Sequence, residues 1–171
     1  MAKTIFAKHR KENFKSRMLR LGCNLFPVYR RTGARVVYVS DDVKDIHVRL
    51  GLNWKTRNYV GSVFGGSIYG ALDPIYMLQI IHLLGDDYIV WDKSAHIKFL
   101  KPVYKKVYSR FLITDELLNE IVAKVKAEGK YTIELPAHFE DEGGVKYAEV
   151  TKTIYIADKK FYKERKKEKE A

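Results

Sequence analysis

The feature that most limits the fold is a helical stretch of sequence, residues 64–84, that is apolar around nearly its whole circumference. Apolar side chains recur at spacings of three and four residues from Phe64 to Leu78, and others fill much of the opposite side. A helix of this kind is stable only when other elements surround it. We therefore predict a long central helix over residues 64–84, ending before Gly85, with sheet packed against it.

Alternation of apolar and polar residues predicts strands on both sides of this helix in the sequence. The stretches with this pattern are residues 35–40, 45–52, 88–100, 107–114, 131–140 and 145–157. The first two are joined by the turn candidate Asp41-Asp42 and predict a hairpin. Pro136 marks the strand at 131–140 as an edge strand or as the site of a bulge.

In the second strand of the hairpin, the polar residues Asp45, His47 and Arg49 share one face and apolar residues share the other. The pattern predicts a solvated polar face with a surface histidine at position 47. A further helix is predicted over residues 115–128, with Thr114 as its N-cap and Gly129 at its end. The charged tail, residues 158–171, has no apolar face and is predicted to be a solvated, frayed end.

Helices and strands are segregated along the chain rather than strictly alternating. The fold class is therefore α+β: an antiparallel sheet wrapped around one long central apolar helix, with an added N-terminal helix and a helix inserted between strands. A length of 171 residues and an apolar content of 46% are enough for one core. We predict one domain over residues 28–157, a basic helix over residues 1–27 before it and a charged tail over residues 158–171 after it.

The net charge of +11 belongs to the two ends of the chain. Residues 1–35 contain ten basic side chains and one acid, and residues 158–171 contain seven and four, but residues 36–157 contain fifteen and sixteen. A neutral body without an interleaved aromatic and basic surface does not favour nucleic acid as a partner. A single cysteine, Cys23, excludes an intramolecular disulfide, and no apolar run reaches the length of a membrane span, so we expect a cytoplasmic protein.

The predicted N-terminal helix is amphipathic. Phe14, Met18, Leu21 and Leu25 share one face, and Pro27 ends the helix. A basic amphipathic helix can lie on a membrane surface. Most helices of this kind instead pack their apolar face on their own domain, and we expect that arrangement here, with peripheral membrane contact as the alternative.

The residues that could carry chemistry are concentrated between Asn58 and Pro74. Gly65 and Gly66 open the central helix, where backbone N–H groups without helical partners can bind an anion, or a carbonyl oxygen that is becoming one. The alternative is that the two glycines only allow another backbone to pass closely.

Asp73 lies within the most apolar helix of the chain, where an unpaired carboxylate would be costly and so needs a partner or a use. The pair Asp73-Pro74 is also typical of a helix N-cap followed by the first helical residue. Because the apolar period continues from Phe64 through Leu78, and Gly70 leaves room for the proline ring, we favour one helix kinked at Pro74.

The spacing from Asn58 through Gly65-Gly66 to Asp73 resembles the active-site signature of the hot-dog-fold acyl-CoA thioesterases of the PaaI (phenylacetyl-CoA thioesterase) type. The segments NYVGSVFGGSIYGALDP and YIVWDKSAHIKFLKP resemble a branch of that superfamily known mainly as a domain of unknown function. The resemblance covers residues 25–157. It implies a sheet wrapped around one long helix, and assembly as a dimer or a dimer of dimers.

The resemblance also implies roles for single residues. The N–H of Gly65 would polarise the thioester carbonyl, Asn58 would position water or substrate, and Asp73 of the partner subunit would act as base or nucleophile. The chain departs from the family at Phe64, where the thioesterases usually carry histidine. The substrate-binding candidates are Phe64, Gly66, Ser67, Asp92 and Ser94. For Asp92 and Ser94 a role in holding the attacking water is the alternative, and an ordinary ion pair on the strand is the interpretation that we favour.

Two functions follow as hypotheses. The first is hydrolysis of an acyl-CoA or acyl-carrier-protein thioester, without a metal and without a cofactor other than the CoA of the substrate. Arg30, Arg31 and Arg35 are then the nearest candidates to hold the CoA phosphates. The second is a non-catalytic acyl-CoA or fatty-acyl binding or sensor protein on the same fold, which Phe64 in place of histidine suggests.

Overall fold

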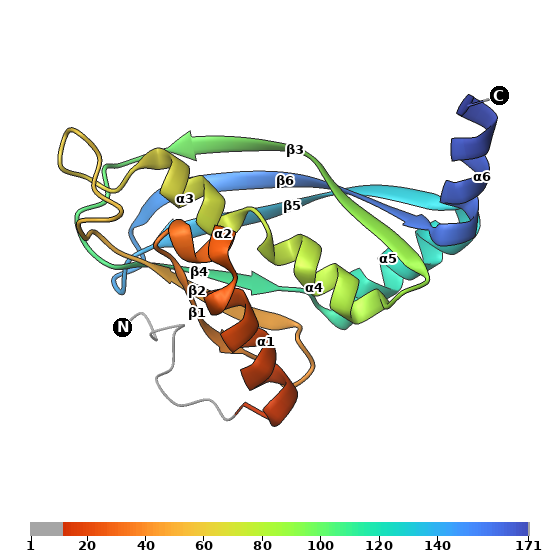
Figure 1. The fold of residues 1–171 in the computed structure, drawn as a ribbon, viewed down its shortest axis with the longest axis horizontal. Helices are drawn as coiled ribbons and strands as arrows, with labels where there is room; N and C mark the ends of the chain where they lie inside the picture. Colours follow the sequence, from red (N-terminus) through yellow and green to blue (C-terminus); the bar gives the residue numbers. More distant parts are fainter. Residues whose placement is uncertain (1–11, 171) are drawn as a thin grey trace.

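The computed structural model describes residues 12–170 (Figure 1). The described helices and strands are α1 (Phe14–Leu25), α2 (Pro27–Arg31), β1 (Arg35–Val39), β2 (Asp45–Leu50), α3 (Gly65–Leu72), α4 (Ile75–Leu84), β3 (Tyr88–Phe99), β4 (Val107–Leu112), α5 (Asp115–Glu128), β5 (Lys130–Glu140), β6 (Lys146–Asp158) and α6 (Lys159–Glu170). All the predicted strands are confirmed to within two residues at either end. The helix α5 is confirmed with its cap, because the Thr114 side chain accepts a hydrogen bond from the Leu117 N–H and Gly129 is left-handed.

The strands form one antiparallel sheet in the order β1-β2-β4-β5-β6-β3. Along its length β5 pairs with β6, but with β4 it pairs only at Tyr108 and Glu140. Pro136 therefore lies where β5 is open on one side, as predicted for a residue that has no N–H to donate. Among the described strands β3 pairs with β6 alone, so the outer edge of β3 is open.

The predicted central helix is present as two helical segments, α3 and α4, that follow one another along the sheet (Figure 1). The break falls at Asp73 and Pro74, which both keep right-handed helical backbone angles. The Asp73 N–H still donates to the Tyr69 carbonyl at 2.9 Å, and no side chain caps α4. Pro74 has no N–H and its ring crowds the preceding turn, which explains the kink. The prediction of one helix kinked at Pro74 is therefore confirmed, and Asp73 is not the N-cap of a separate helix.

The core lies between the central helix and the sheet. Leu72, Ile75 and Ile80 of the helix are at most 1% exposed, and they belong to one buried cluster with residues of every strand. Tyr76 packs edge-on against Phe111 of β4, and its hydroxyl donates to the Pro136 carbonyl at 2.8 Å. A side chain of the central helix thus satisfies a backbone oxygen of β5 where β4 does not pair with that strand.

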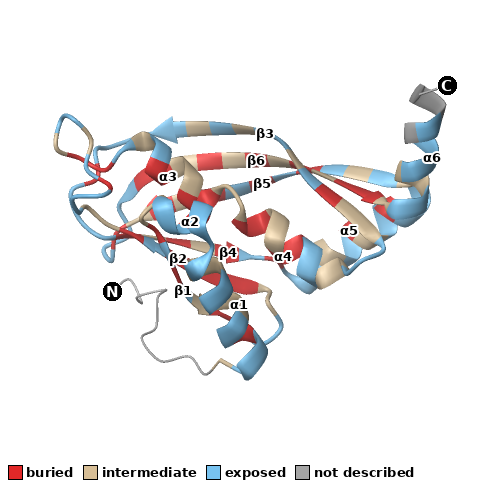
Figure 2. Ribbon diagram, viewed as in Figure 1, coloured by how far each residue is buried: buried red, intermediate tan, exposed pale blue. Residues whose placement is uncertain are grey.

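The prediction that the N-terminal helix packs its apolar face on the domain is wrong. Phe14, Met18, Leu21 and Leu25 are 78%, 52%, 45% and 67% exposed, and Figure 2 shows α1 largely exposed. The helix instead packs through its other side, where Ser16 is buried and Leu19 and Cys23 contact the core. No helix within residues 12–170 is long and apolar enough to cross a bilayer.

Polar side chains hold α1 against the outer edge of β1. Asn24 donates to the Val36 carbonyl at 2.8 Å and accepts from the Val36 N–H at 2.9 Å. The Glu12 carboxylate accepts from the Val39 N–H at 2.9 Å and pairs with Arg20. These bonds replace the strand that β1 lacks on this side, so this edge of the sheet is closed.

The solvated polar face predicted for the hairpin is also wrong at two of its three positions. Asp45 and His47 are 6% and 3% exposed, and only Arg49 is exposed. The reason is cross-strand pairing: Arg110 of β4, directly opposite His47, donates to both oxygens of Asp45 at 2.9 and 3.0 Å. His47 Nε2 lies 3.0 Å from Asp45 Oδ1, and the Tyr38 ring of β1 packs edge-on against the imidazole. Asp45 and His47 are therefore buried by contacts with other polar side chains rather than exposed to solvent.

The tail predicted to be frayed contains the helix α6, which corrects that prediction. Asp158 starts the helix, because its Oδ1 accepts hydrogen bonds from the N–H groups of Lys160 and Phe161 at 2.9 and 3.0 Å. The Phe161 ring lies directly over Gly129, in the space that a side chain there would need. The cap, this aromatic contact and two hydrogen bonds from Lys159 to the carbonyls of Asp86 and Asp87 anchor a helix that otherwise has no apolar face.

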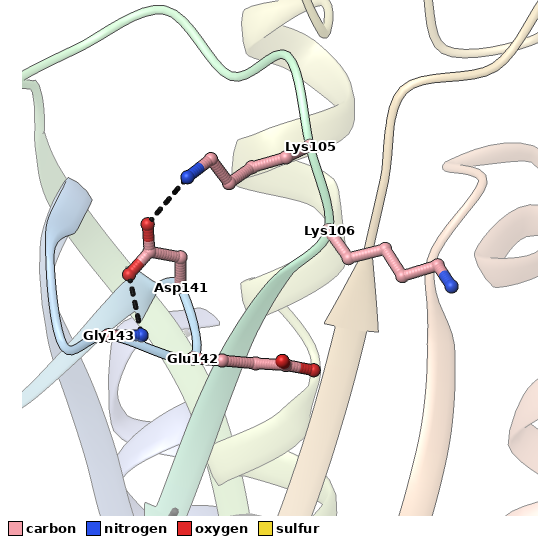
Figure 3. A pocket seen from close by; sticks show the side chains of 5 residues that line it. All are labelled: Lys105, Lys106, Asp141, Glu142 and Gly143. Atoms are coloured by element: carbon pink, nitrogen blue, oxygen red, sulfur yellow. Dashed lines mark hydrogen bonds and ion pairs between the residues drawn. The ribbon is translucent and has the colours of Figure 1, made fainter. Parts of the chain in front are cut away.

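Figure 3 shows how the turn between β5 and β6 is fixed. Asp141 Oδ1 accepts from the N–H groups of Gly143 and Val145 at 2.9 and 3.1 Å, and Lys105 Nζ lies 3.0 Å from Oδ2. Lys106 points away from this carboxylate. The surface hollow that these residues line is therefore a hydrogen-bonded turn whose nearer lysine is already paired.

Candidate functional site

A buried lysine joins two carboxylates beside the kink of the central helix. Lys152 of β6 places its Nζ 2.6 Å from Asp73 Oδ1 and 3.2 Å from Asp92 Oδ2 of β3. The ring of Tyr69 lies 5.5 Å from the same ammonium group. The lysine side chain is 1% exposed, whereas that of Asp73 is 41% exposed. The ammonium group of the cluster is therefore buried, and the Asp73 carboxylate is partly exposed to solvent.

The charge of Lys152 is maintained by its partners. Burial acts to lower the pKa of Lys152, but the hydrogen bonds and negative charges of Asp73 and Asp92 outweigh burial and leave the pKa raised. A permanently charged ammonium group fixes the direction in which the Asp73 carboxylate points.

Asp92 is the more deeply placed carboxyl of the cluster. Burial raises its pKa; Lys152 acts against this, and the charge of Asp73 acts with it. Its Oδ1 is buried without a hydrogen-bond partner among the described residues. Asp92 pairs with Ile154, which is buried in the same phase of β6 as Lys152, and the register of β3 against β6 shifts between Asp92 and Ser94. A carboxyl with a raised pKa beside a second carboxylate is a place where a proton can be held.

An apolar groove of about 510 Å³ runs from Asp73 between the N-terminal helices and the central helix. Its lining residues are Gly22, Cys23, Phe26, Val28, Tyr29, Thr32, Gly70, Asp73, Pro74, Ile75, Met77 and Leu78. Asp73 is the one carboxylate in this lining. The Tyr29 hydroxyl donates to the Ala71 carbonyl at 3.2 Å, which holds α2 against α3. A charged group thus stands at the side of a groove that is otherwise suited to a hydrocarbon chain.

The N-terminus of α3 presents free backbone donors. Within residues 12–170 neither the Gly65 N–H nor the Gly66 N–H has a hydrogen-bond partner. A side chain on Gly65 would lie 3.1 Å from the Phe99 ring, and one on Gly66 would collide with the ring of Phe64. Both glycines therefore let aromatic rings cover a helix end whose N–H groups remain available to an oxygen.

Gly65 and Asp73 are too far apart in one chain to act on the same atom. They are eight residues apart along α3, and a helical rise of 1.5 Å per residue separates their backbones by about 12 Å. A carbonyl bound at the Gly65 N–H can be reached by Asp73 only if the two residues come from different copies of the chain.

The remaining predicted site residues lie apart from the cluster. Asn58 closes its own loop, because its Nδ2 donates to Ser62 Oγ at 2.9 Å and its Oδ1 accepts from the Ser62 N–H at 3.0 Å. Ser67 is buried in the first turn of α3, and Ser94 is exposed on β3. Arg30, Arg31 and Arg35 are exposed on α2 and at the start of β1. Of the predicted residues, the structure brings Asp73 and Asp92 together around Lys152 and places the Phe64 ring over Gly66.

Lys152 is the residue that the sequence analysis missed. In β6 the residues at 150, 154 and 156 are apolar and buried, and Lys152 occupies the same phase. A lysine in the inward phase of a strand signals a buried ion pair. Among the described residues no group of three His, Cys, Asp or Glu side chains is placed to bind a metal ion.

The backbone is similar to solved structures of thioesterase-like proteins. A Pseudomonas aeruginosa protein of unknown function, described as a probable thioesterase, matches with a TM-score of 0.73 at 15% identity over 83% of this chain and 95% of its own. A thioesterase from Haemophilus influenzae matches with a TM-score of 0.61 at 15% identity over 85% and 92%. A Chlorobaculum tepidum protein of unknown function matches with a TM-score of 0.68 at 16% identity over 84% and 94%. The fold is the hot-dog fold that the sequence resemblance implied.

Sequence comparison gives one further match. Residues 15–156 match the model of a family described as a domain of unknown function, DUF4442. No protein with curated function matches the chain significantly.

Proposed function

This chain belongs to the DUF4442 family, and on that premise we propose that it hydrolyses the thioester bond of an acyl-CoA or of an acyl-carrier protein. The observation that carries the proposal is the position of Asp73. Its carboxylate is held by a buried cation and opens onto an apolar groove of about 510 Å³. The similarity of the fold to thioesterases supports the same reaction class.

The reaction needs a base and a polarised carbonyl. The thioester oxygen accepts hydrogen bonds from the free N–H groups of Gly65 and Gly66, which stabilise the oxyanion as it forms. Asp73 takes a proton from a water molecule, whose oxygen bonds to the carbonyl carbon. The C–S bond then breaks, the electron pair leaves with sulfur, and the proton returns from Asp73 to the thiolate or to solvent.

Phe64 in place of histidine is compatible with this scheme. A thiol has a pKa of about 8.5, so its thiolate can leave without being protonated in the same step. The ring of Phe64 is 57% exposed beside Gly66, where it covers the helix end with apolar surface. Its contribution is then to exclude water from the oxyanion site rather than to transfer a proton.

The proposal includes a dimer, because Asp73 reaches the Gly65 N–H only from another copy. The open edge of β3 is a site where a second sheet can pair. Phe99 of β3 lies against Gly65, so a copy that pairs along β3 comes close to the helix end. In this assembly each site takes its glycine from one chain and its aspartate from the other.

In this proposal the groove binds the acyl chain of the substrate, and basic residues bind its CoA part. The acyl chain lies in the groove between the N-terminal helices and α4, with Ile75, Met77 and Leu78 in its wall. Arg30 and Arg31, between the groove residues Tyr29 and Thr32, hold the phosphates of CoA in this proposal.

A panel of acyl-CoAs of graded chain length, with release of free thiol as the readout, tests the proposal. We expect hydrolysis by the wild type and a loss of two or more orders of magnitude in kcat for Asp73→Asn, the scale of a lost general base. Asp86→Asn, at an exposed turn outside the cluster, is the matched control and should keep full activity. Saturable acyl-CoA binding without thiol release, equal in the wild type and Asp73→Asn, would instead identify the acyl-binding protein that Phe64 suggests.

A further inference from the structure

A continuous apolar surface on α1 and α2 has no cover within the described residues. It consists of Phe14, Met18, Leu21, Leu25, Phe26 and Val28, which we call the apolar face; each is at least 45% exposed. Exposed apolar surface arranged along one side of a helix is unusual for a chain without a partner. Figure 2 shows the exposed side of α1 on the outside of the molecule.

The direction of the apolar face is set by how α1 packs. At 100° per residue, the side chains of Phe14, Met18, Leu21 and Leu25 fall within a narrow stripe. Ser16, Leu19 and Cys23, which contact the domain, lie on the opposite side of the helix. The stripe therefore points directly away from the protein, where a flat surface can meet it.

Basic residues border the apolar stripe. By the same helical spacing Lys15 lies on one side of it and Arg17 on the other, and both are exposed. Arg30 and Arg31 continue the charge at the end of α2. Between residues 12 and 35 the one acid is Glu12, and it is paired with Arg20. An apolar stripe with a positively charged border complements the headgroups and the acyl layer of an anionic bilayer.

A second copy of the chain fits this surface less well. A two-fold contact packs the same face of both copies against itself. Both copies would then bring basic borders, which contain Lys15 and Arg17, into one contact, and the one acid between residues 12 and 35, Glu12, is already paired with Arg20. The charge therefore favours an anionic lipid surface over self-association.

We propose that the apolar face of α1 and α2 docks this protein on anionic lipid membranes. Phe26 and Val28 belong both to the apolar face and to the lining of the groove beside Asp73. Docking through this face brings the opening of the groove to the lipid surface, where amphiphilic acyl compounds accumulate. The docking itself does not depend on hydrolysis, so it is tested separately from the enzymatic activity.

Co-sedimentation of the full chain with lipid vesicles tests the proposal. We expect binding to vesicles of phosphatidylcholine mixed with phosphatidylglycerol, weakening as salt is added, and much less binding to phosphatidylcholine alone. Phe14→Ser/Leu25→Ser should weaken binding about tenfold or more, because two exposed apolar anchors are lost. Lys15→Gln/Arg17→Gln should weaken binding to the anionic vesicles by about tenfold.

The control is Leu112→Ser, which removes an exposed leucine from β4, and it should bind like the wild type. All variants change exposed side chains, and circular dichroism checks that each is folded. Absence of binding to anionic vesicles, or equal binding by Phe14→Ser/Leu25→Ser, overturns the proposal. It is also overturned if that variant changes only the mass in solution, which would make the face an interface between copies. Binding that appears only after deletion of residues 1–11 would assign the face to that segment.

Discussion

Lys152 is the residue on which the candidate site depends. Its ammonium group lies between Asp73 and Asp92 with 1% of the side chain exposed, among the apolar residues of β6. A charge so buried is stable only when it is paired, and its partners are equally constrained by it. The position of the proposed base is thus fixed by a residue on another element.

Lys152→Met keeps the shape of the side chain and removes the charge. We expect the free energy of unfolding to fall by about 1–3 kcal/mol, below the range for fully buried pairs because Asp73 is 41% exposed. Thiol release should fall by about tenfold or more, because the base loses its fixed position. Urea denaturation and the acyl-CoA panel measure the two effects. Lys146→Met, an exposed lysine of the same strand, should change neither; equal effects of both substitutions would contradict the role of Lys152.

At the scale of residues, the sequence predicted part of the candidate site. Asp73 could be singled out because it is the one acid in an apolar helix, and Asp92 because a resemblance includes its segment. Lys152 could be placed only by the phase of its strand, and its partners lie on two other elements. The free energy of such a pair depends on distances that one strand's pattern does not contain.

At the scale of elements, three strands are locked together around Asp45. His47 of β2 and Arg110 of β4 contact this carboxylate, and Tyr38 of β1 packs against the His47 ring. Burial alone would raise the pKa of Asp45, but the hydrogen bonds from His47 and Arg110 hold it well below its usual range. The cluster therefore stabilises the folded chain only while this carboxyl is ionised.

The pH dependence of stability follows from this lowered pKa. In the unfolded chain an aspartate has a pKa of about 3.9. The stabilisation by Asp45 is therefore complete above that pH, and it is lost as the pH falls from there through the lower pKa of the folded state. We expect Asp45→Asn to be less stable than the wild type by about 2–4 kcal/mol near neutral pH. The difference should shrink in acid. Urea denaturation near about pH 7 and about pH 3 measures it; a difference that is equal at both values would contradict the assignment, and Asp86→Asn is the control.

Element type was largely predictable, and the errors have physical causes. The period of the apolar residues predicted every strand and the central helix, because packing against one core imposes that period. The prediction that the polar face of the hairpin is exposed failed because alternation identifies the polar face of a strand but not the residues that cover it. Here Arg110 of the neighbouring strand covers it. The prediction for residues 158–171 failed because the Asp158 cap, the Phe161 contact and the hydrogen bonds of Lys159 fix a helix with no apolar stripe.

At the scale of the whole molecule, the separation of Gly65 from Asp73 makes the proposed activity a property of two chains. Gly65 and Asp73 are eight residues apart along a straight helix, which is about 12 Å. The chain's composition predicted one core, but the arrangement of two copies depends on surfaces that the sequence does not mark.

Mixing two inactive variants tests the shared site. Gly65→Val blocks the oxyanion donors and Asp73→Asn removes the base, so each alone should be inactive in the acyl-CoA assay. After co-refolding, half of the dimers are mixed, and each mixed dimer contains one intact site, so activity should recover to about a quarter of the wild type. Recovery that stays at the level of the separate variants would place both residues of a working site in one chain. Gly51→Val mixed with Asp73→Asn is the control, because Gly51 lies after β2 without a positive φ; it should be active alone and give about half of the wild-type activity in the mixture.

The two edges of the sheet differ in a way that limits polymerisation. Asn24 and Glu12 occupy the backbone groups of β1 that another strand would need, while β3 offers its edge without such a block. Two copies joined along β3 therefore present only capped ends to further chains. A dimer paired along β3, as proposed, therefore has no free strand edge at which further pairing could extend it into a fibre.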